Sequence, residues 1–320
     1  MIVLSNEGLC RSTPLRSNYT TSIILERMYI RLVILCCALL KYAYCYQAVI
    51  PDTKLYTMNG TIPIETFLVD DSNNGFGYHY TYSEASFDKL TVSLNDTIIK
   101  ITENIEYLKQ NYKELDPRIL TNKLTKKQWV ILAILLNKNV FKSAKVAVFG
   151  SQEPWVETVA ILLGAKEVTV IEYNQLTYNH NKIKTVSKHN FLDFFSYHSN
   201  ELGTYDVALS ISAFDHSGLG RYGDQLDPFG DINEGMIKVK ELLKDDGLLF
   251  LTVPIGPDLL VWNLMRIYGP IRLELLLNGW EFVDRIGWDQ NKLTQSTDNY
   301  RDTFEPVLIL KTESIAEEEL

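Results

Sequence analysis

From residue 145 onward, short apolar runs alternate with amphipathic stretches. The apolar runs have the length and the Val, Ile and Leu content of buried strands, and they predict strands at 145–150, 167–172, 206–212, 248–254, 281–288 and 305–311, with a weaker one at 182–188. The stretches between them predict helices at 154–163, 231–244, 259–267 and 272–277. Regular alternation of this kind is typical of an α/β fold with a mostly parallel, Rossmann-like doubly wound sheet.

The residues before this region follow a different pattern. Residues 51–82 are rich in Asn, Gly, Thr and Tyr without sustained periodicity, and residues 84–112 carry apolar side chains at helical spacing. Lys126–Phe141 predicts a helix that is buried on most sides. We therefore divide the chain into a targeting segment (1–45), an irregular to helical lead-in (46–124), an α/β domain (125–312) and an acidic tail (313–320).

The targeting segment is predicted from Leu32–Leu40, nine apolar residues that follow Arg27 and Arg31. A membrane-spanning helix needs ~20 apolar residues, whereas a run of this length suits the core of a signal peptide. Glycosylation sequons at Asn18, Asn59 and Asn95 agree with passage through the secretory pathway. We expect a protein of the secretory pathway, and retention of the segment as a single-pass membrane anchor is the alternative.

Composition excludes several classes of protein. With 46% hydrophobic and 22% charged residues, the chain is neither fibrous nor largely disordered. All four cysteines lie within the first 45 residues, so the remainder has no disulfide framework and no thiol chemistry. The formal net charge of −9 argues against nucleic acid as a partner, because binding to phosphates depends on clustered Lys and Arg.

Candidate ligand-binding residues follow the first two strands of the α/β region. In a doubly wound sheet, ligands bind beyond the carboxyl ends of the strands, near the point where strand order reverses. Gly150 allows a close backbone approach there, and Glu172 can accept hydrogen bonds from both hydroxyls of a ribose. Only one glycine is present and Glu153 would repel a pyrophosphate, so S-adenosylmethionine, which has ribose but no phosphate, fits better than a dinucleotide.

A polar loop, Ser212–Pro228, follows the 206–212 strand. His216 is a candidate general base oriented by Asp215 or Asp224, and Arg221 can hold an anionic or hydroxyl-rich substrate. Two alternatives stay open. The acidic side chains, including Asp227, can hold a divalent cation, or they can fold the loop through bonds to its own backbone.

Four motifs in the α/β region resemble one uncharacterised family, domain of unknown function 268. They are Val146–Trp155, Ser210–Asp224, Leu251–Gly256 and Arg266–Arg272. That family is in turn similar to class I S-adenosylmethionine-dependent methyltransferases. The resemblance implies a seven-stranded sheet with an antiparallel last strand, Gly150 in the first cofactor loop and Glu172 on the ribose.

Together these observations predict an S-adenosylmethionine-dependent methyltransferase that acts on a small-molecule or glycan hydroxyl. Its predicted cofactor site consists of Gly150, Ser151, Glu172, Tyr173 and Ser212, and its predicted catalytic residues are Asp215, His216, Arg221 and Asp224. No resident metal is expected. The alternatives are an inactive methyltransferase-like scaffold, in which Glu153 and Trp155 block the pocket, and a metal-dependent enzyme that uses a nucleotide-sugar.

Overall fold

The computed structural model describes most of the chain beyond residue 79. The described residues are 80–112, 116–187, 199–222, 224, 226–261, 264–295 and 302–313, together with the backbone of three short strands at 47–49, 56–57 and 62–63. The predicted targeting segment, two of the three sequons and the tail from residue 314 lie outside them. Within these ranges, no helix combines the length and the apolar character that a membrane crossing requires.

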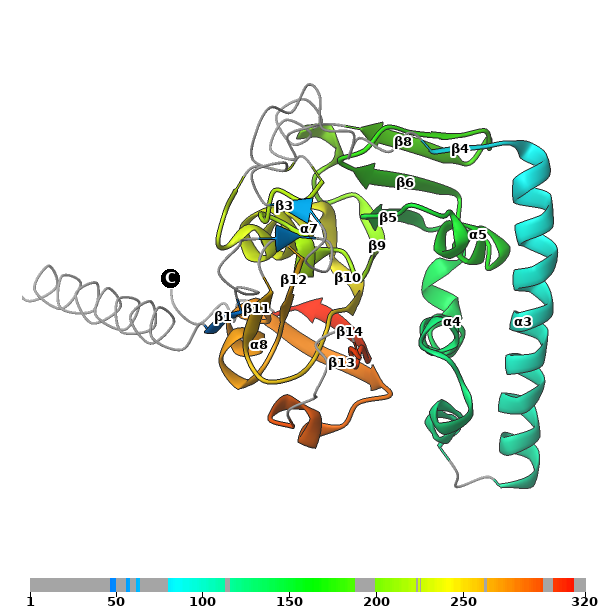
Figure 1. Ribbon diagram of the computed structural model, residues 1–320. Coiled ribbons are helices and arrows are strands. Elements are labelled where there is room, and N and C mark those ends of the chain that lie inside the picture. The colour runs from blue at the N-terminus through cyan, green and yellow to red at the C-terminus, as the bar shows by residue number, and fades with distance from the viewer. Residues whose placement is uncertain are drawn as a thin grey trace, which may run out of the picture. The chain divides into compact units, whose positions relative to one another are not determined.

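A seven-stranded sheet forms the centre of the molecule (Figure 1). Its strands, in spatial order, are β13 (Trp280–Ile286), β14 (Val307–Thr312), β10 (Leu243–Thr252), β9 (Tyr205–Ile211), β5 (Lys145–Phe149), β6 (Glu167–Glu172) and β8 (Ile183–Ser187). β14 is antiparallel to both of its neighbours, and the other pairs are parallel. The predicted α/β fold with a mostly parallel sheet is confirmed, and the weak strand predicted at 182–188 is present as β8.

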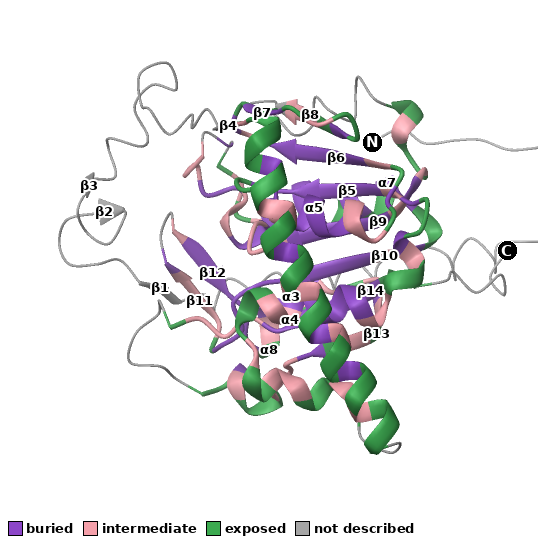
Figure 2. Ribbon diagram, turned by 90° about the vertical axis from the view of Figure 1, so that its right-hand side faces the viewer, coloured by how far each residue is buried: buried purple, intermediate pink, exposed green. Residues whose placement is uncertain are grey.

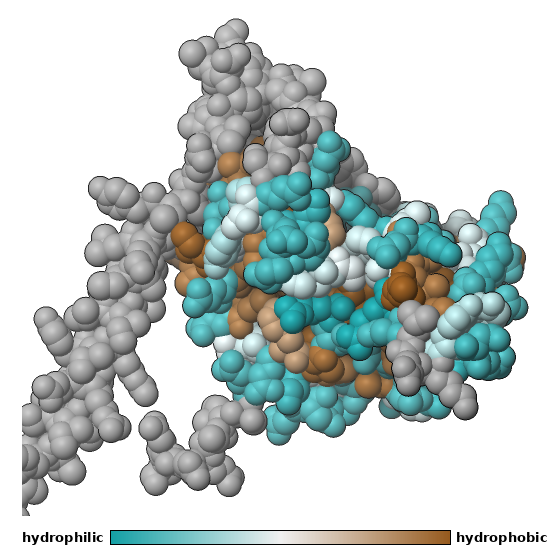
Figure 3. Space-filling model, turned by 90° about the horizontal axis from the view of Figure 1, so that it is seen from below, coloured by the Kyte–Doolittle hydropathy of each residue, from teal (hydrophilic) through white to brown (hydrophobic). Residues whose placement is uncertain are grey.

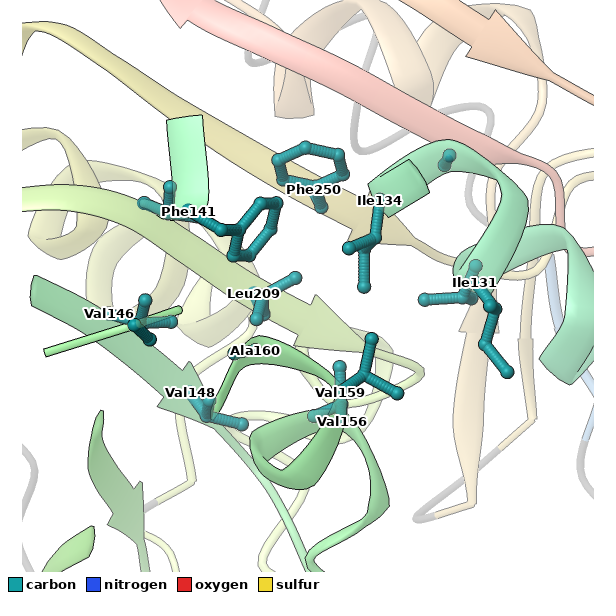
Figure 4. Close-up of a cluster of buried hydrophobic side chains, with 14 of the residues drawn as sticks. Ile131, Ile134, Phe141, Val146, Val148, Val156, Val159, Ala160, Leu209 and Phe250 are labelled. Atoms are coloured by element: carbon teal, nitrogen blue, oxygen red, sulfur yellow. The ribbon is translucent and has the colours of Figure 1, made fainter. Parts of the chain in front are cut away.

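Helices cover both faces of this sheet, because alternate residues of each strand point to opposite sides. On one face, Val146 and Val148 of β5 join a core that includes α3, α4 and α5 (Figure 4). On the other face, Ala147 and Phe149 join a second core that includes α7 and α8. The helices are α3 (Glu84–Asn111), α4 (Lys126–Leu136), α5 (Trp155–Leu162), α7 (Ile237–Leu242) and α8 (Pro270–Leu276), with 3-10 turns at Pro117–Lys123, Lys138–Phe141, Ser199–Glu201, Phe214–His216 and Gln290–Leu293.

The helices before the sheet agree with the apolar pattern. α3 buries one stripe, formed by Phe87, Leu94, Ile101 and Ile105, and exposes its other side (Figure 2). α4 is buried from Val130 to Leu135, and Thr125 begins it with a capping box. α3 and α4 therefore pack together on one face of the sheet.

One predicted helix is wrong. Residues 259–267 form two antiparallel strands, β11 (Leu259–Val261) and β12 (Met265–Ile267), and β11 also pairs in parallel with β1 (Gln47–Val49). A short apolar segment has no reliable period, and its partner lies more than two hundred residues away in the sequence. The remaining short strands are β2 (Tyr56–Thr57) with β3 (Ile62–Pro63), and β4 (Tyr80–Tyr82) with β7 (Leu176–Tyr178).

A second correction concerns the helix predicted at 231–244. Its first part is a π-helix, Asp231–Met236, and α7 follows and ends at Leu242. Asp231 and Glu234 have the spacing of a capping box, but no side chain caps this helix and both carboxylates bind groups elsewhere in the fold. The last two residues of the predicted helix, 243 and 244, belong to β10.

Seen from below, the described surface carries mostly hydrophilic side chains, with hydrophobic residues in smaller patches (Figure 3).

Candidate ligand-binding site

A pocket of about 400 Å³ opens at the carboxyl ends of β5, β6 and β9. Strand order reverses between β5 and β9, so the pocket lies where doubly wound sheets bind ligands. Its volume is within the range of small-molecule sites. Its wall contains the residues of the predicted cofactor site, which are Gly150, Ser151, Glu172, Tyr173 and Ser212. Of the predicted catalytic residues, His216 and Asp224 line it, whereas Asp215 and Arg221 do not.

Gly150 makes the turn from β5 into the pocket. Its φ is +70°, in the left-handed region that favours glycine. A Cβ placed there would lie 2.3 Å from the Cβ of Ala213, so a side chain is excluded by contact as well as by conformation. The Gly150 N–H donates to the Ile171 carbonyl at 3.1 Å, which joins the ends of β5 and β6.

The rest of this loop is held by the protein itself. Tyr178 donates its hydroxyl to the Gln152 carbonyl at 2.8 Å, and Thr158 donates to the Pro154 carbonyl at 2.6 Å. Glu153 is 56% exposed, with its carboxylate 3.9 Å from Lys127 of α4. Glu153 thus lines the pocket together with Trp155 and also faces Lys127 of α4.

Glu172 ends β6 and is almost completely buried in the pocket wall. Its Oε1 accepts hydrogen bonds from the backbone N–H and the side-chain amide of Asn174, at 3.1 and 3.0 Å. Its Oε2 faces Gly150, 3.9 Å from where a Cβ would lie. Burial raises the pKa of Glu172 to about 7. The hydrogen bonds from Asn174 oppose this rise, and the charge of Asp224 adds to it.

Tyr173 extends from the same strand end across to the π-helix. Its hydroxyl donates to Glu234, which joins the two sides of the site. Burial and the Glu234 charge raise the pKa of Tyr173 well above its ordinary value, so the phenol keeps its proton. The π-helix thus supplies a carboxylate to the site, and short π segments are frequent at functional sites.

Ser212, the first residue after β9, is held in a strained conformation. Its φ is +50°, which is uncommon for a residue with a side chain. Its N–H donates to the carbonyl and the hydroxyl of Thr252, at 3.1 and 2.9 Å. Its hydroxyl donates to Glu305 Oε2. Glu305 is also bound by Lys126 at 3.2 Å and by Thr303.

Asp215 and His216 form a pair, of which only His216 lines the pocket. Nε2 of His216 lies 3.4 Å from Oδ2 of Asp215, and Nδ1 is hydrogen bonded to the Leu264 carbonyl. Both ring nitrogens therefore contact protein oxygens, and a substrate hydroxyl can reach a ring nitrogen only if one of these contacts opens. Burial raises the pKa of Asp215. Its Oδ1 has no hydrogen-bond partner among the described residues.

The other polar residues of the loop mainly hold its shape. Asp224 accepts hydrogen bonds from the N–H groups of Gly220 and Tyr222, at 3.2 and 3.1 Å. Asp227 accepts one from the Phe229 N–H at 2.8 Å. Arg221 lies against the Tyr222 ring, 5.6 Å from its centroid. Asp224 and Asp227 thus act on the backbone, as one of the alternatives for this loop predicted.

Two buried arginines that were not identified from the sequence hold the same loop. Arg266 is completely excluded from solvent and donates to four loop carbonyls, those of Asp215, Ser217, Asp227 and Pro228. Arg272 donates to the Pro228 carbonyl at 3.1 Å. The sequence signal was present in the Arg266–Arg272 motif, but its partners lie about forty to fifty residues earlier in the chain.

Glu157 is a second feature that the sequence did not indicate. It lies in the first turn of α5 and is completely buried. Neither carboxyl oxygen has a hydrogen-bond partner within the described part of the chain. Burial raises its pKa to about 7, and the neighbouring Ser151 hydroxyl offsets only part of that rise.

The donor groups near the pocket do not form a metal site. Among the described residues, no three His, Cys, Asp or Glu side chains gather with the geometry to hold an ion. Both oxygens of Asp224 accept hydrogen bonds from backbone N–H groups, and those of Asp227 accept from the Phe229 N–H and the Asn233 side-chain amide.

The family described as "Caenorhabditis protein of unknown function, DUF268" matches residues 143–307. The chain belongs to this family, as the four motifs predicted. No curated protein matches the sequence.

Solved structures with a similar fold include the 1,6-didemethyltoxoflavin-N1-methyltransferase of Burkholderia thailandensis with bound S-adenosylhomocysteine. It is 14% identical at a TM-score of 0.42, over 69% of this chain and 90% of that one. The branched-chain polyamine synthase of Thermus thermophilus is 8% identical at a TM-score of 0.36, over 58% of this chain and 56% of that one. We base the fold on the strand order above and not on these similarities.

Proposed function

We propose that the chain is a class I S-adenosylmethionine-dependent methyltransferase. The strand order agrees with this class, since six parallel strands and an antiparallel β14, inserted between β10 and β13, reproduce the sheet that the family resemblance implies. The observation that carries the proposal is the pairing of Glu172 with Gly150. It combines a buried carboxylate with a side-chain-free turn at the end of the neighbouring strand.

The residues present fit the cofactor. Oε1 of Glu172 is fixed by Asn174, and Oε2 faces Gly150, which suits the two hydroxyls of a ribose. Val148, Ile171 and Ile211 supply apolar wall for a nucleoside base. No Lys or Arg occurs among the described lining residues, which favours a ligand without phosphate. Bound S-adenosylmethionine would supply an activated methyl group.

This chain's contribution to the reaction would be mainly positional. A pocket built on three strand ends holds the donor in a fixed orientation, and proximity then accounts for most of the acceleration. We further propose a hydroxyl acceptor, a glycan being one example, at the polar loop. His216 paired with Asp215 would take its proton once a ring nitrogen is released. The secretory pathway as the place of action belongs to the same proposal and rests on the sequence pattern of residues 1–45 and the sequons.

The two alternatives have less support. An inactive scaffold was expected to have its pocket blocked by Glu153 and Trp155. Both side chains line the pocket, which still has a volume of about 400 Å³. Lys127 approaches them from α4, lying 3.9 Å from the Glu153 carboxylate and 4.7 Å from the Trp155 ring centroid. A metal-dependent sugar transferase would need the loop carboxylates, and those of Asp224 and Asp227 are bound to backbone N–H groups.

Isothermal titration of the full-length chain with S-adenosylmethionine tests the proposal. We expect binding by the wild type and a loss of roughly tenfold or more in affinity for Glu172→Ala, which removes a charged hydrogen-bond acceptor. Glu274→Ala, at an exposed position on α8, is the matched control and should bind as the wild type does. A folded wild-type protein that gives no heat at high micromolar ligand would rule the proposal out.

A further inference from the structure

The loop after β5 offers few groups to the amino-acid end of a ligand. The carbonyls of Gln152, Glu153 and Pro154 already accept hydrogen bonds, from Tyr178, from the backbone N–H of Trp155 and from Thr158. These carbonyls face the protein, and only Gly150 of this loop is free of a side chain. A charged end group of a ligand therefore needs another partner in the pocket.

Ser212 presents such a partner at the next strand end. Its hydroxyl proton is donated to Glu305, and its oxygen, which also lies 3.3 Å from the Thr252 hydroxyl, can act toward a ligand only as an acceptor. The side chain lies in the pocket wall, and the strained φ of +50° fixes it there. An oxygen with this arrangement accepts a hydrogen bond from a ligand and cannot donate one.

The surroundings of Ser212 are acidic. Burial acts to raise the pKa of Glu305, but the hydrogen bonds from Ser212 and Thr303 and the charge of Lys126 outweigh it and hold the pKa below its ordinary value. Glu305 therefore stays ionised. The buried Asp215, three residues after Ser212, has its Oδ1 without a partner among the described residues. Because Ser212 donates its hydroxyl proton to the ionised Glu305, its oxygen is polarised toward accepting from a positively charged donor.

We propose that Ser212, backed by Glu305, binds the protonated amino group of the ligand whose ribose lies on Glu172. This inference rests on the proposed function. The strands β6, β5 and β9 are adjacent, so the ends of β6 and β9 are roughly 10 Å apart. That span matches the distance from the ribose to the amino group of S-adenosylmethionine or S-adenosylhomocysteine. Glu305, just before β14, thus becomes a positioning residue for the amino-acid end.

Two ligands separate this role from a general effect on the pocket. S-adenosylhomocysteine carries the amino group within its amino-acid end, whereas 5′-methylthioadenosine has the same nucleoside and thioether without that whole end. Titration of full-length Ser212→Ala and Glu305→Gln should show S-adenosylhomocysteine binding weakened by roughly tenfold, with 5′-methylthioadenosine binding changed by less than about twofold. Glu274→Gln serves as the control on an exposed surface.

The result that overturns the inference is an equal loss for both ligands, or no loss for S-adenosylhomocysteine. In either case, binding of 5′-methylthioadenosine by the wild type would still support the proposed nucleoside site at Glu172. Failure of the wild type to bind either ligand would remove the proposed function and this inference together. Because Glu305 also holds Lys126 and Thr303, its variant can lose stability. Ser212→Ala, which keeps the same backbone preference and removes one hydroxyl, then decides the question.

Discussion

Nη2 of Arg272 lies 2.6 Å from Oδ1 of Asp231, and both side chains are almost wholly excluded from solvent. The Tyr268 hydroxyl donates to the second oxygen of the same carboxylate at 3.0 Å. Nε of Arg266 lies 3.6 Å from Oδ1 of Asp231, and its guanidinium also donates to carbonyls of the polar loop. The Arg266–Arg272 motif and the polar loop thus form one buried unit.

Arg272→Met should destabilise the fold by roughly 3–5 kcal/mol, because it leaves the Asp231 carboxylate buried without its closest cation. Urea denaturation measures the free energy of unfolding. Arg118→Met is the control, since Arg118 is half-exposed and its ion pairs with Asp116 and Asp284 should contribute less than about 1 kcal/mol. Equal effects of the two substitutions would contradict a structural role for the buried pair.

Glu157 should make the fold less stable as pH rises. Its pKa in the folded protein is about 7, above the ordinary 4.5, so the folded state binds the proton more tightly than the unfolded state does. Stability is then fully present below pH 4.5 and falls as pH rises toward 7. Relative to the wild type, Glu157→Gln should be neutral near pH 4.5 and more stable by roughly 3 kcal/mol at pH 8. Denaturant titrations at the two pH values check this, and a difference that does not change with pH would refute it.

Ligand affinity should rise with pH through the titration of Glu172. The ribose hydroxyls donate to the ionised carboxylate, whose pKa is about 7 in the free protein, so binding must displace a proton at lower pH. Affinity for 5′-methylthioadenosine, which has no titrating group in this range, should increase by roughly tenfold from pH 6 to pH 8. Glu172→Gln should remove this dependence. An unchanged pH profile in that variant would assign the effect to another group.

The strain at Ser212 can be measured by comparing two substitutions. Ser212→Ala and Ser212→Gly both lose the hydroxyl, but only glycine adopts the φ of +50° without strain. The glycine variant should therefore unfold with a free energy about 1 kcal/mol higher than the alanine variant. Thermal melting of the pair tests this, and equal stabilities would mean that the backbone relaxes at this position.

The sequence predicted those parts of the fold that depend on residues close together in the chain. Val146 and Val148 alternate with Ala147 and Phe149 along an apolar run, and a run of that kind identifies a buried strand whatever surrounds it. Gly150 and Glu172 follow from strand ends, because parallel strands bring their carboxyl ends to one edge. Their positions at the ends of two strands were therefore enough to predict that both residues line the pocket.

The sequence did not predict contacts between residues that lie far apart in the chain. Nothing near Arg266 indicates that it will be buried, because its acceptors are carbonyls of the polar loop. Glu305 reaches Ser212 from a position ninety-three residues later in the chain. Asp231 and Glu234 have the spacing of a capping box, yet the same carboxylates make tertiary contacts instead. Such contacts depend on topology, which a single sequence specifies only indirectly.

The central claim is that the pocket binds an adenosine-containing cofactor through Glu172. A crystal structure of the full-length chain with S-adenosylhomocysteine tests it most directly. We predict the nucleoside at the carboxyl ends of β5 and β6, with a ribose hydroxyl within hydrogen-bond distance of Oε2 of Glu172. Electron density for the ligand elsewhere on the protein, or its absence from a pocket soaked at millimolar concentration, would contradict the account.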